Sequence, residues 1–218
     1  MRPGFTLIEL LVVISLIAIL ACMLLPAIRA VSDAAKGQRC RGNLRQIGIG
    51  ANLYADDNEF YPPAIWWHSD GVGDRYWMGF LAPYVEGNKT FDSGSINQIR
   101  TTSVMYGCPL FKPVANTPTS VGYGMTPYPN APARETINQA DEQPVNTQGF
   151  VYRLYRPGDI SHATQRPYVA DSTNWSLPAS SLNRHRGRQN TLYFDLHVGA
   201  MTYLELAKAV NQGTLFDL

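Results

Sequence analysis

The chain has 218 residues, enough for one membrane segment followed by one globular domain with its own core. Lys and Arg number 18 against 17 Asp and Glu, so a formal net charge of +1 favours neither nucleic acid nor acidic substrates as partners. The three cysteines allow only one pair, which excludes a disulfide-rich scaffold.

Residues 4–28, GFTLIELLVVISLIAILACMLLPAI, form an almost unbroken apolar run, and about 20 such residues cross a bilayer as a helix. A secretory signal fits poorly, because it has its small-residue cleavage site after the apolar segment, whereas here the positive, small-residue element at residues 1–4 comes before it. A plain anchor does not explain Glu9, since a carboxylate deep in the membrane costs about 3 kcal/mol and usually marks a function.

Residues 4–10, GFTLIEL, resemble the prepilin processing motif of type IV pilins and type II secretion pseudopilins. The resemblance implies that a prepilin peptidase cuts between Gly4 and Phe5 and methylates the new terminus. It also implies that Glu9 meets the Phe5 amine of a neighbouring subunit during assembly, and that Pro26 is the helix-weakening proline of this family. Because the paired charges offset each other's desolvation, Glu9 would favour a single stagger between subunits.

A single long helix is predicted from about residue 5 to residue 54, about 75 Å at 1.5 Å per residue. Its second half is amphipathic, and one face carries Cys40, Leu44, Ile47, Ala51 and Tyr54 at helical spacing. The acidic cluster at residues 56–58 and the prolines at 62–63 predict its end.

Residues 40–63 resemble a branch of pilin-like proteins abundant in planctomycete-type bacteria, which also carry a late His, nine residues, Asp-Gly signature. Here His185 and Asp195 match that signature, but Leu196 replaces the glycine. Asp-Gly favours a type I′ hairpin turn with positive φ, so Leu196 leaves the turn type open.

We expect an α+β, pilin-like fold with the long N-terminal helix packed on a small antiparallel sheet. The expected organisation is a leader at 1–4, the helix at 5–58 and a head domain at 59–218. Within the helix, 5–28 is the transmembrane or filament-core part and 29–58 is the amphipathic part. Strands are expected at 103–106, 149–155, 167–170, 190–194 and 197–203, a helix at 204–211, and a surface excursion at 112–148.

Cys40 and Cys108 allow two interpretations. Outside the cytoplasm a disulfide could tie the sheet to the helix. Alternatively, both are independent buried thiols. Cys22 lies within the apolar run and has no assigned chemistry.

Candidate metal ligands fall into two groups. A transition metal could be held by His185, Asp195 and His197, with Asp171. Calcium could be held by the loops at 56–57 or at Asp70 and Asp74. We favour the simpler interpretation, in which His185 and Asp195 form hydrogen bonds across turns, so no cofactor is expected and calcium is the open alternative.

Two surface features have alternative interpretations. The basic run at residues 184–188 could contact nucleic acid, but we expect a solvated or ion-paired loop and no nucleic-acid partner. Eight aromatic residues between 60 and 84 could form a glycan-binding surface or could be core and subunit contact. No local catalytic arrangement is evident, and we expect no enzyme.

The sequence therefore predicts a structural subunit of a type IV pilus-like filament or pseudopilus, assembled as a helical homo-oligomer. The implied partners are the prepilin peptidase and the pilus or type II secretion machinery. The precursor would span the inner membrane once before it enters a periplasmic or extracellular filament. The alternative is a minor or tip pilin-like protein that binds glycan or surfaces.

Overall fold

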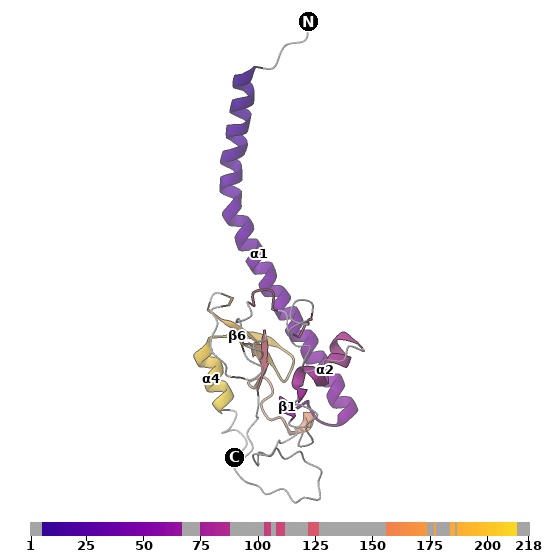
Figure 1. The fold of residues 1–218 in the computed structure, drawn as a ribbon. Coiled ribbons are helices and arrows are strands. Elements are labelled where there is room, and N and C mark those ends of the chain that lie inside the picture. The colour runs from indigo at the N-terminus through magenta and orange to yellow at the C-terminus, as the bar shows by residue number, and fades with distance from the viewer. Residues whose placement is uncertain are drawn as a thin grey trace, which may run out of the picture.

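The computed structural model describes residues 6–66, 75–87, 103–105, 108–111, 122–126, 156–173, 177, 184–185 and 187–212. Within them a single helix, α1 (Leu7–Asn58), projects far beyond a head built on its C-terminal half (Figure 1). The expected strand at 149–155, most of the excursion at 112–148 and residues 1–5 lie outside the described residues.

Helix α1 has a capping residue at each end. Thr6 is the N-cap residue and Glu59, with φ of 69°, is a left-handed C-cap just after the acidic cluster. The predicted apolar face of its second half is confirmed, because the side chains at its five positions are all buried: Cys40, Leu44, Ile47, Ala51 and Tyr54.

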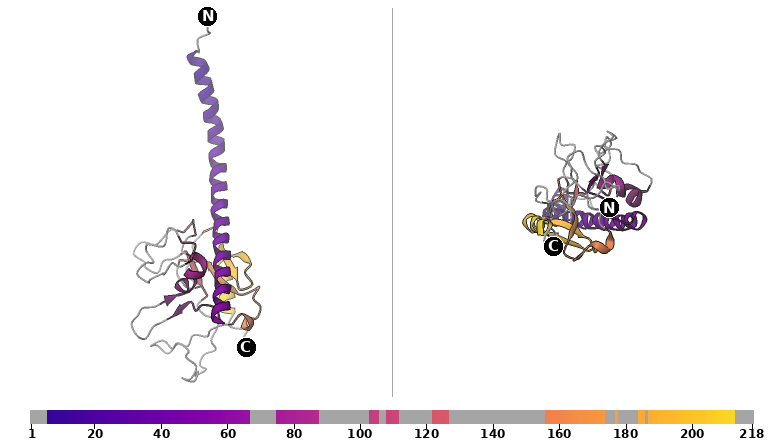
Figure 2. Two further views of the ribbon diagram at one scale, coloured as in Figure 1. Left: turned by 90° about the vertical axis from the view of Figure 1, so that its right-hand side faces the viewer. Right: turned by 90° about the horizontal axis from the view of Figure 1, so that it is seen from below.

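The head packs around α1 on two sides (Figure 2). Helix α2 (Trp77–Glu86) contacts one side of α1, preceded by a two-stranded antiparallel ribbon of β1 (Ile65–Trp66) and β2 (Arg75–Tyr76). The sheet contacts α1 through β5 (Gln189–Tyr193) and β6 (Val198–Met201). The sequence analysis did not anticipate α2, whose aromatic residues and internal Pro83 conceal its helical pattern.

The sheet is antiparallel, with strand order β3-β4-β5-β6, and its other two strands are β3 (Tyr123–Met125) and β4 (Pro167–Asp171). Side chains of β4 alternate between two clusters: Val169 belongs to the core that contains α1, and Ala170 packs with Leu206 of α4 (Tyr203–Gln212). Helix α4 therefore covers the sheet face opposite α1. The predicted α+β, pilin-like fold class is confirmed.

Two predicted segments are wrong. Residues 103–105 form a turn, because Glu86 at the end of α2 accepts a hydrogen bond from the Ser103 hydroxyl and one of 2.7 Å from the Val104 N–H. Residues 123–125, which lie within the predicted surface excursion, instead form buried strand β3. A three-residue strand with all side chains buried shows no alternation that a sequence pattern could reveal.

Candidate functional site

The N-terminal half of α1 exposes a continuous apolar surface. Its most hydrophobic window of 18 residues has a mean hydropathy of 2.9, and none of that window is buried. Large exposed side chains include Leu7 at 82 %, Ile8 at 70 % and Met23 at 71 %. A patch of this extent needs lipid or neighbouring protein to cover it. By length and composition the helix can cross a membrane.

Glu9 closes the N-terminus of α1. One of its carboxylate oxygens accepts hydrogen bonds from the Thr6 N–H at 2.8 Å and the Thr6 hydroxyl at 2.6 Å, and the Glu9 N–H donates to that hydroxyl. This reciprocal arrangement is a capping box. The sequence analysis missed this role, although Thr followed three residues later by Glu is its sequence signature.

Three further residues of the processing and assembly motif differ in how far the structure describes them. Gly4 and Phe5 lie outside the described residues, so the cleavage site remains a prediction. Pro26 lies inside α1, which continues through it. Because proline has no N–H, the carbonyl of Cys22 has no helical donor at that turn.

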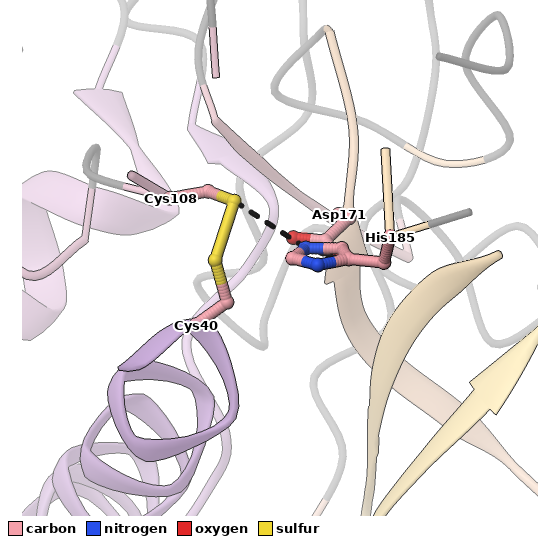
Figure 3. A group of neighbouring side chains, drawn as sticks. All are labelled: Cys40, Cys108, Asp171 and His185. Atoms are coloured by element: carbon pink, nitrogen blue, oxygen red, sulfur yellow. Dashed lines mark hydrogen bonds and ion pairs between the residues drawn. A yellow bond between two sulfur atoms is a disulfide. The ribbon is translucent and has the colours of Figure 1, made fainter. Parts of the chain in front are cut away.

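A second group of side chains meets where α1 enters the head (Figure 3). Cys40, the first buried residue of α1, forms a disulfide with Cys108, and their Cα atoms are 5.1 Å apart. His185 Nε2 lies 3.5 Å from the Cys108 Sγ and 3.1 Å from Asp171 Oδ2. We call Cys40, Cys108, Asp171 and His185 the junction cluster.

The sheet holds the acidic member of the junction cluster in place. Asp171 ends β4, its side chain is 1 % exposed, and its Oδ2 accepts a 2.8 Å hydrogen bond from the Asn190 N–H. Asp171 Oδ1 lies 4.0 Å from Arg184 Nη1 but has no hydrogen bond. The carboxylate therefore has unused acceptor capacity inside the protein.

The basic run at 184–188 does not form one surface patch. Arg184 is buried, donates to the Gly122 and Ser172 carbonyls, and lies 4.9 Å from the centre of the Phe111 ring. Burial lowers the pKa of Arg184, and the charge of Asp171 opposes that change. Arg184 is therefore a structural residue of the head.

The expected turn hydrogen bonds of the late signature have other partners. His185 pairs with Asp171, whereas Asp195 Oδ1 lies 2.6 Å from His197 Nδ1 in the turn between β5 and β6. Tyr193 N–H donates to the His197 carbonyl, which makes residues 194–196 a three-residue loop. Leu196, with φ of 69°, occupies its left-handed position, where glycine is preferred.

The predicted metal groupings are only partly reproduced. Among the described residues, a single group of three or more His, Cys, Asp or Glu side chains could hold a metal ion, and it is the junction cluster. It joins His185 to Asp171, as one prediction had it, but includes neither Asp195 nor His197. The calcium candidates Asp70 and Asp74 lie outside the described residues. The Asp57 carboxylate accepts from the Tyr84 hydroxyl at 3.0 Å.

Six of the eight aromatic residues between 60 and 84 lie in the core or pack against it. Trp77 is fully buried, and the side chains of Phe60, Tyr61, Phe80 and Tyr84 pack partly buried against the same cluster. This packing supports the interpretation of these residues as core.

Comparisons with known proteins address the same N-terminal helix. Residues 2–25 match the family described as "Prokaryotic N-terminal methylation motif". The chain is also similar to the type II secretion system core protein G of Pseudomonas aeruginosa, with 37 % identity over 61 residues. That match covers 28 % of this chain and 43 % of the relative, so the chain spans less than half the length of the relative, and no solved structure matches significantly.

Proposed function

We propose that this chain is a structural subunit of a type IV pilus-like filament or a secretion pseudopilus, assembled through α1. The observation that carries the proposal is the division of α1 into two halves. The second half completes the core of the head, whereas the first half exposes apolar side chains that nothing in the described part of the chain covers. Lipid would cover them in the precursor, and the same segments of other subunits would cover them in a filament.

Processing would separate these two states. A peptidase that cuts between Gly4 and Phe5 removes the charged leader and creates a new amine one residue before the helix cap. The match of residues 2–25 to the methylation motif supports this step. The precursor would span the inner membrane with residues 1–4 in the cytoplasm, and the head would lie on the other side.

Glu9 would then set the stagger between subunits. Its carboxylate already accepts two hydrogen bonds from Thr6, which fix its orientation at the start of α1. A carboxylate has about four acceptor sites, so Glu9 can receive the Phe5 amine of a neighbour without releasing the cap. In an apolar filament core an unpaired carboxylate is costly. Subunits would therefore be most stable at the stagger that pairs the Glu9 carboxylate with the Phe5 amine of a neighbour.

Two variants separate the charge of Glu9 from its capping role. Glu9→Gln keeps a side chain that completes a capping box but removes the charge, whereas Thr6→Ala removes the cap and keeps the charge. Filaments sheared from cells should be lost with Glu9→Gln and retained with Thr6→Ala, while both proteins stay in the membrane fraction. Normal filament yield with Glu9→Gln would overturn the role of the charge.

Mass spectrometry of the N-terminal peptide tests the proposal as a whole. A chain that begins at N-methylated Phe5 in sheared filaments supports a pilus subunit. The same processed chain confined to membranes supports a pseudopilus or a minor component. Recovery of intact Met1 from both fractions would overturn the proposal and leave an anchored domain.

The findings support a structural role rather than an enzyme. The glycan-binding alternative relied on exposed aromatic residues, and six of the eight between 60 and 84 lie in the core or pack against it. Deletion of residues 127–150 would discriminate further, since a filament subunit should still assemble without them.

A further inference from the structure

The junction cluster brings together two sulfur atoms, an imidazole nitrogen and a carboxylate oxygen from four separate parts of the chain. Cys40 lies on α1, Cys108 in a turn, Asp171 at the end of β4, and His185 shortly before β5. One ligand atom from each residue lies within 4.8 Å of the other three. We propose that these four residues bind one Zn²⁺ ion when the Cys40–Cys108 disulfide is reduced.

The donor set and its spacing both fit zinc. Zinc takes four ligands in tetrahedral geometry, and sulfur, nitrogen and carboxylate oxygen are its usual donors. Metal–ligand bonds of about 2.0–2.3 Å place neighbouring donors about 3.3–3.8 Å apart. The distance from Cys108 Sγ to His185 Nε2 is 3.5 Å and that from His185 Nε2 to Asp171 Oδ2 is 3.1 Å, so the protein ligands need only small movements.

An unsatisfied buried atom points independently to a cation. Asp171 is 1 % exposed, yet its Oδ1 accepts no hydrogen bond. A buried carboxylate oxygen in that state is costly unless a positive group lies nearby, and Arg184 Nη1 approaches only to 4.0 Å. A zinc ion bound beside the sulfur atoms would add a directly bonded cation to the more distant charge of Arg184.

The surrounding residues orient the ligands. The Asn190 N–H holds Asp171 Oδ2 at 2.8 Å, and such outer contacts tune metal affinity. His185 has φ of 51°, an unfavourable backbone conformation of the kind that is often kept for a functional reason. His185 also lines a cavity of about 480 Å³ beside α1, together with Gly37 and Arg41, which gives an ion a route to the imidazole.

Disulfide and zinc site exclude each other because both use the same two sulfur atoms. A dithiol reductant breaks the S–S bond with two electrons, becomes a disulfide itself, and passes its two protons to Cys40 and Cys108. Binding of Zn²⁺ then displaces both protons to solvent and leaves two zinc–thiolate bonds. A disulfide reagent reverses the sequence: it takes two electrons from the Cys40 and Cys108 thiolates and two protons from solvent, becomes a dithiol, and leaves the protein disulfide and a free Zn²⁺ ion.

The full-length chain in detergent, with Cys22→Ser to remove the third cysteine, allows a direct test. After reduction and removal of the reductant without air, the chain is loaded with Zn²⁺ or Co²⁺ alone. We expect one zinc per chain by elemental analysis. We also expect thiolate-to-cobalt charge-transfer absorption with the visible bands of a tetrahedral ion. The oxidised chain should bind neither metal.

Matched histidine variants assign the site. His185→Gln should weaken zinc binding at least about tenfold, since loss of even an outer contact costs that much. His197→Gln, in the same late signature but paired with Asp195, should bind like the parent. Equal binding by the oxidised and reduced chains, or equal loss in both variants, would overturn the proposal. So would a cobalt spectrum without thiolate bands, a readout that needs no variant to fold.

Discussion

Gly42 and Gly50 lie two turns apart on α1, and the structure predicts opposite effects of alanine at the two positions. A Cβ added at Gly42 would meet no atom within 4 Å. A Cβ added at Gly50 would lie 2.4 Å from Val85 Cγ2 and 3.6 Å from Tyr84 Cβ, both on α2. Gly50 therefore permits the close approach of α1 and α2, whereas Gly42 has no such role.

Alanine at these positions changes stability through two contributions, helix propensity and packing. Alanine in place of glycine inside a helix gains about 0.8–1.0 kcal/mol, so Gly42→Ala should stabilise by about that much. At Gly50 the same gain is opposed by overpacking, which typically costs about 1–3 kcal/mol. Val85 cannot easily rotate away, because a β-branched side chain in a helix has one strongly preferred rotamer. Gly50→Ala should therefore be less stable than Gly42→Ala by about 1–3 kcal/mol.

Denaturant unfolding of the full chain in detergent, followed by near-ultraviolet circular dichroism, measures this difference in the packing of the head. Val85→Ala provides the control, since it removes the atom that the new methyl group would meet. In a double-mutant cycle, Gly50→Ala should cost less in the Val85→Ala background. Equal stability of the two single alanine variants would refute the close-approach argument. An unchanged cost in the Val85→Ala background would place the clash elsewhere.

Three further changes are testable by the same unfolding assay. Without reductant and metal, Cys108→Ser should lower the free energy of unfolding by up to about 4 kcal/mol, because the bridge spans 68 residues. Cys22→Ser should change it by less than about 0.5 kcal/mol. Equal effects of the two substitutions would contradict the bridge. Leu196→Gly should be at least as stable as Leu196→Ala, because both variants lose the same packing. Only glycine avoids the cost of the left-handed conformation, about 1–2 kcal/mol. A clearly more stable alanine variant would contradict the loop geometry. Glu86→Ala should lower the free energy of unfolding by about 1–3 kcal/mol, because it leaves the Val104 N–H without its acceptor. Glu86→Gln keeps an acceptor oxygen and should lower it less. Equal losses in the two variants would mean that the acceptor is unimportant.

Periodicity predicted the parts of the fold that repeat a regular pattern. The buried face of α1 follows from helical spacing of Leu44, Ile47 and Ala51, and the β5–β6 hairpin follows from alternation near the C-terminus. Helix α2 was missed because nearly every residue in it is apolar or aromatic, so no polar face marks a period. Strand β3 was missed because three buried residues in a proline-rich region carry no period at all.

The candidate sites show a similar division. The Thr6–Glu9 cap is local, spans four residues and could have been predicted from the sequence. The junction cluster is not local, because His185 meets Asp171 only after β3, β4 and β5 pair in register. The sequence drew attention to His185 but suggested Asp195 as its partner, which the hairpin instead places beside His197.

The position of Cys40 connects the two sites. Every α1 residue before Cys40 is exposed or only partly buried, and from Cys40 onward one face of the helix enters the core. The link to Cys108 therefore ties the head to α1 at the boundary between the exposed and the buried half. A tether at that boundary fixes how the head is oriented around the helix axis, whereas one deeper in the head would leave the first buried turn free to fray. In a filament that packs the exposed halves together, this orientation decides which surfaces of neighbouring heads meet.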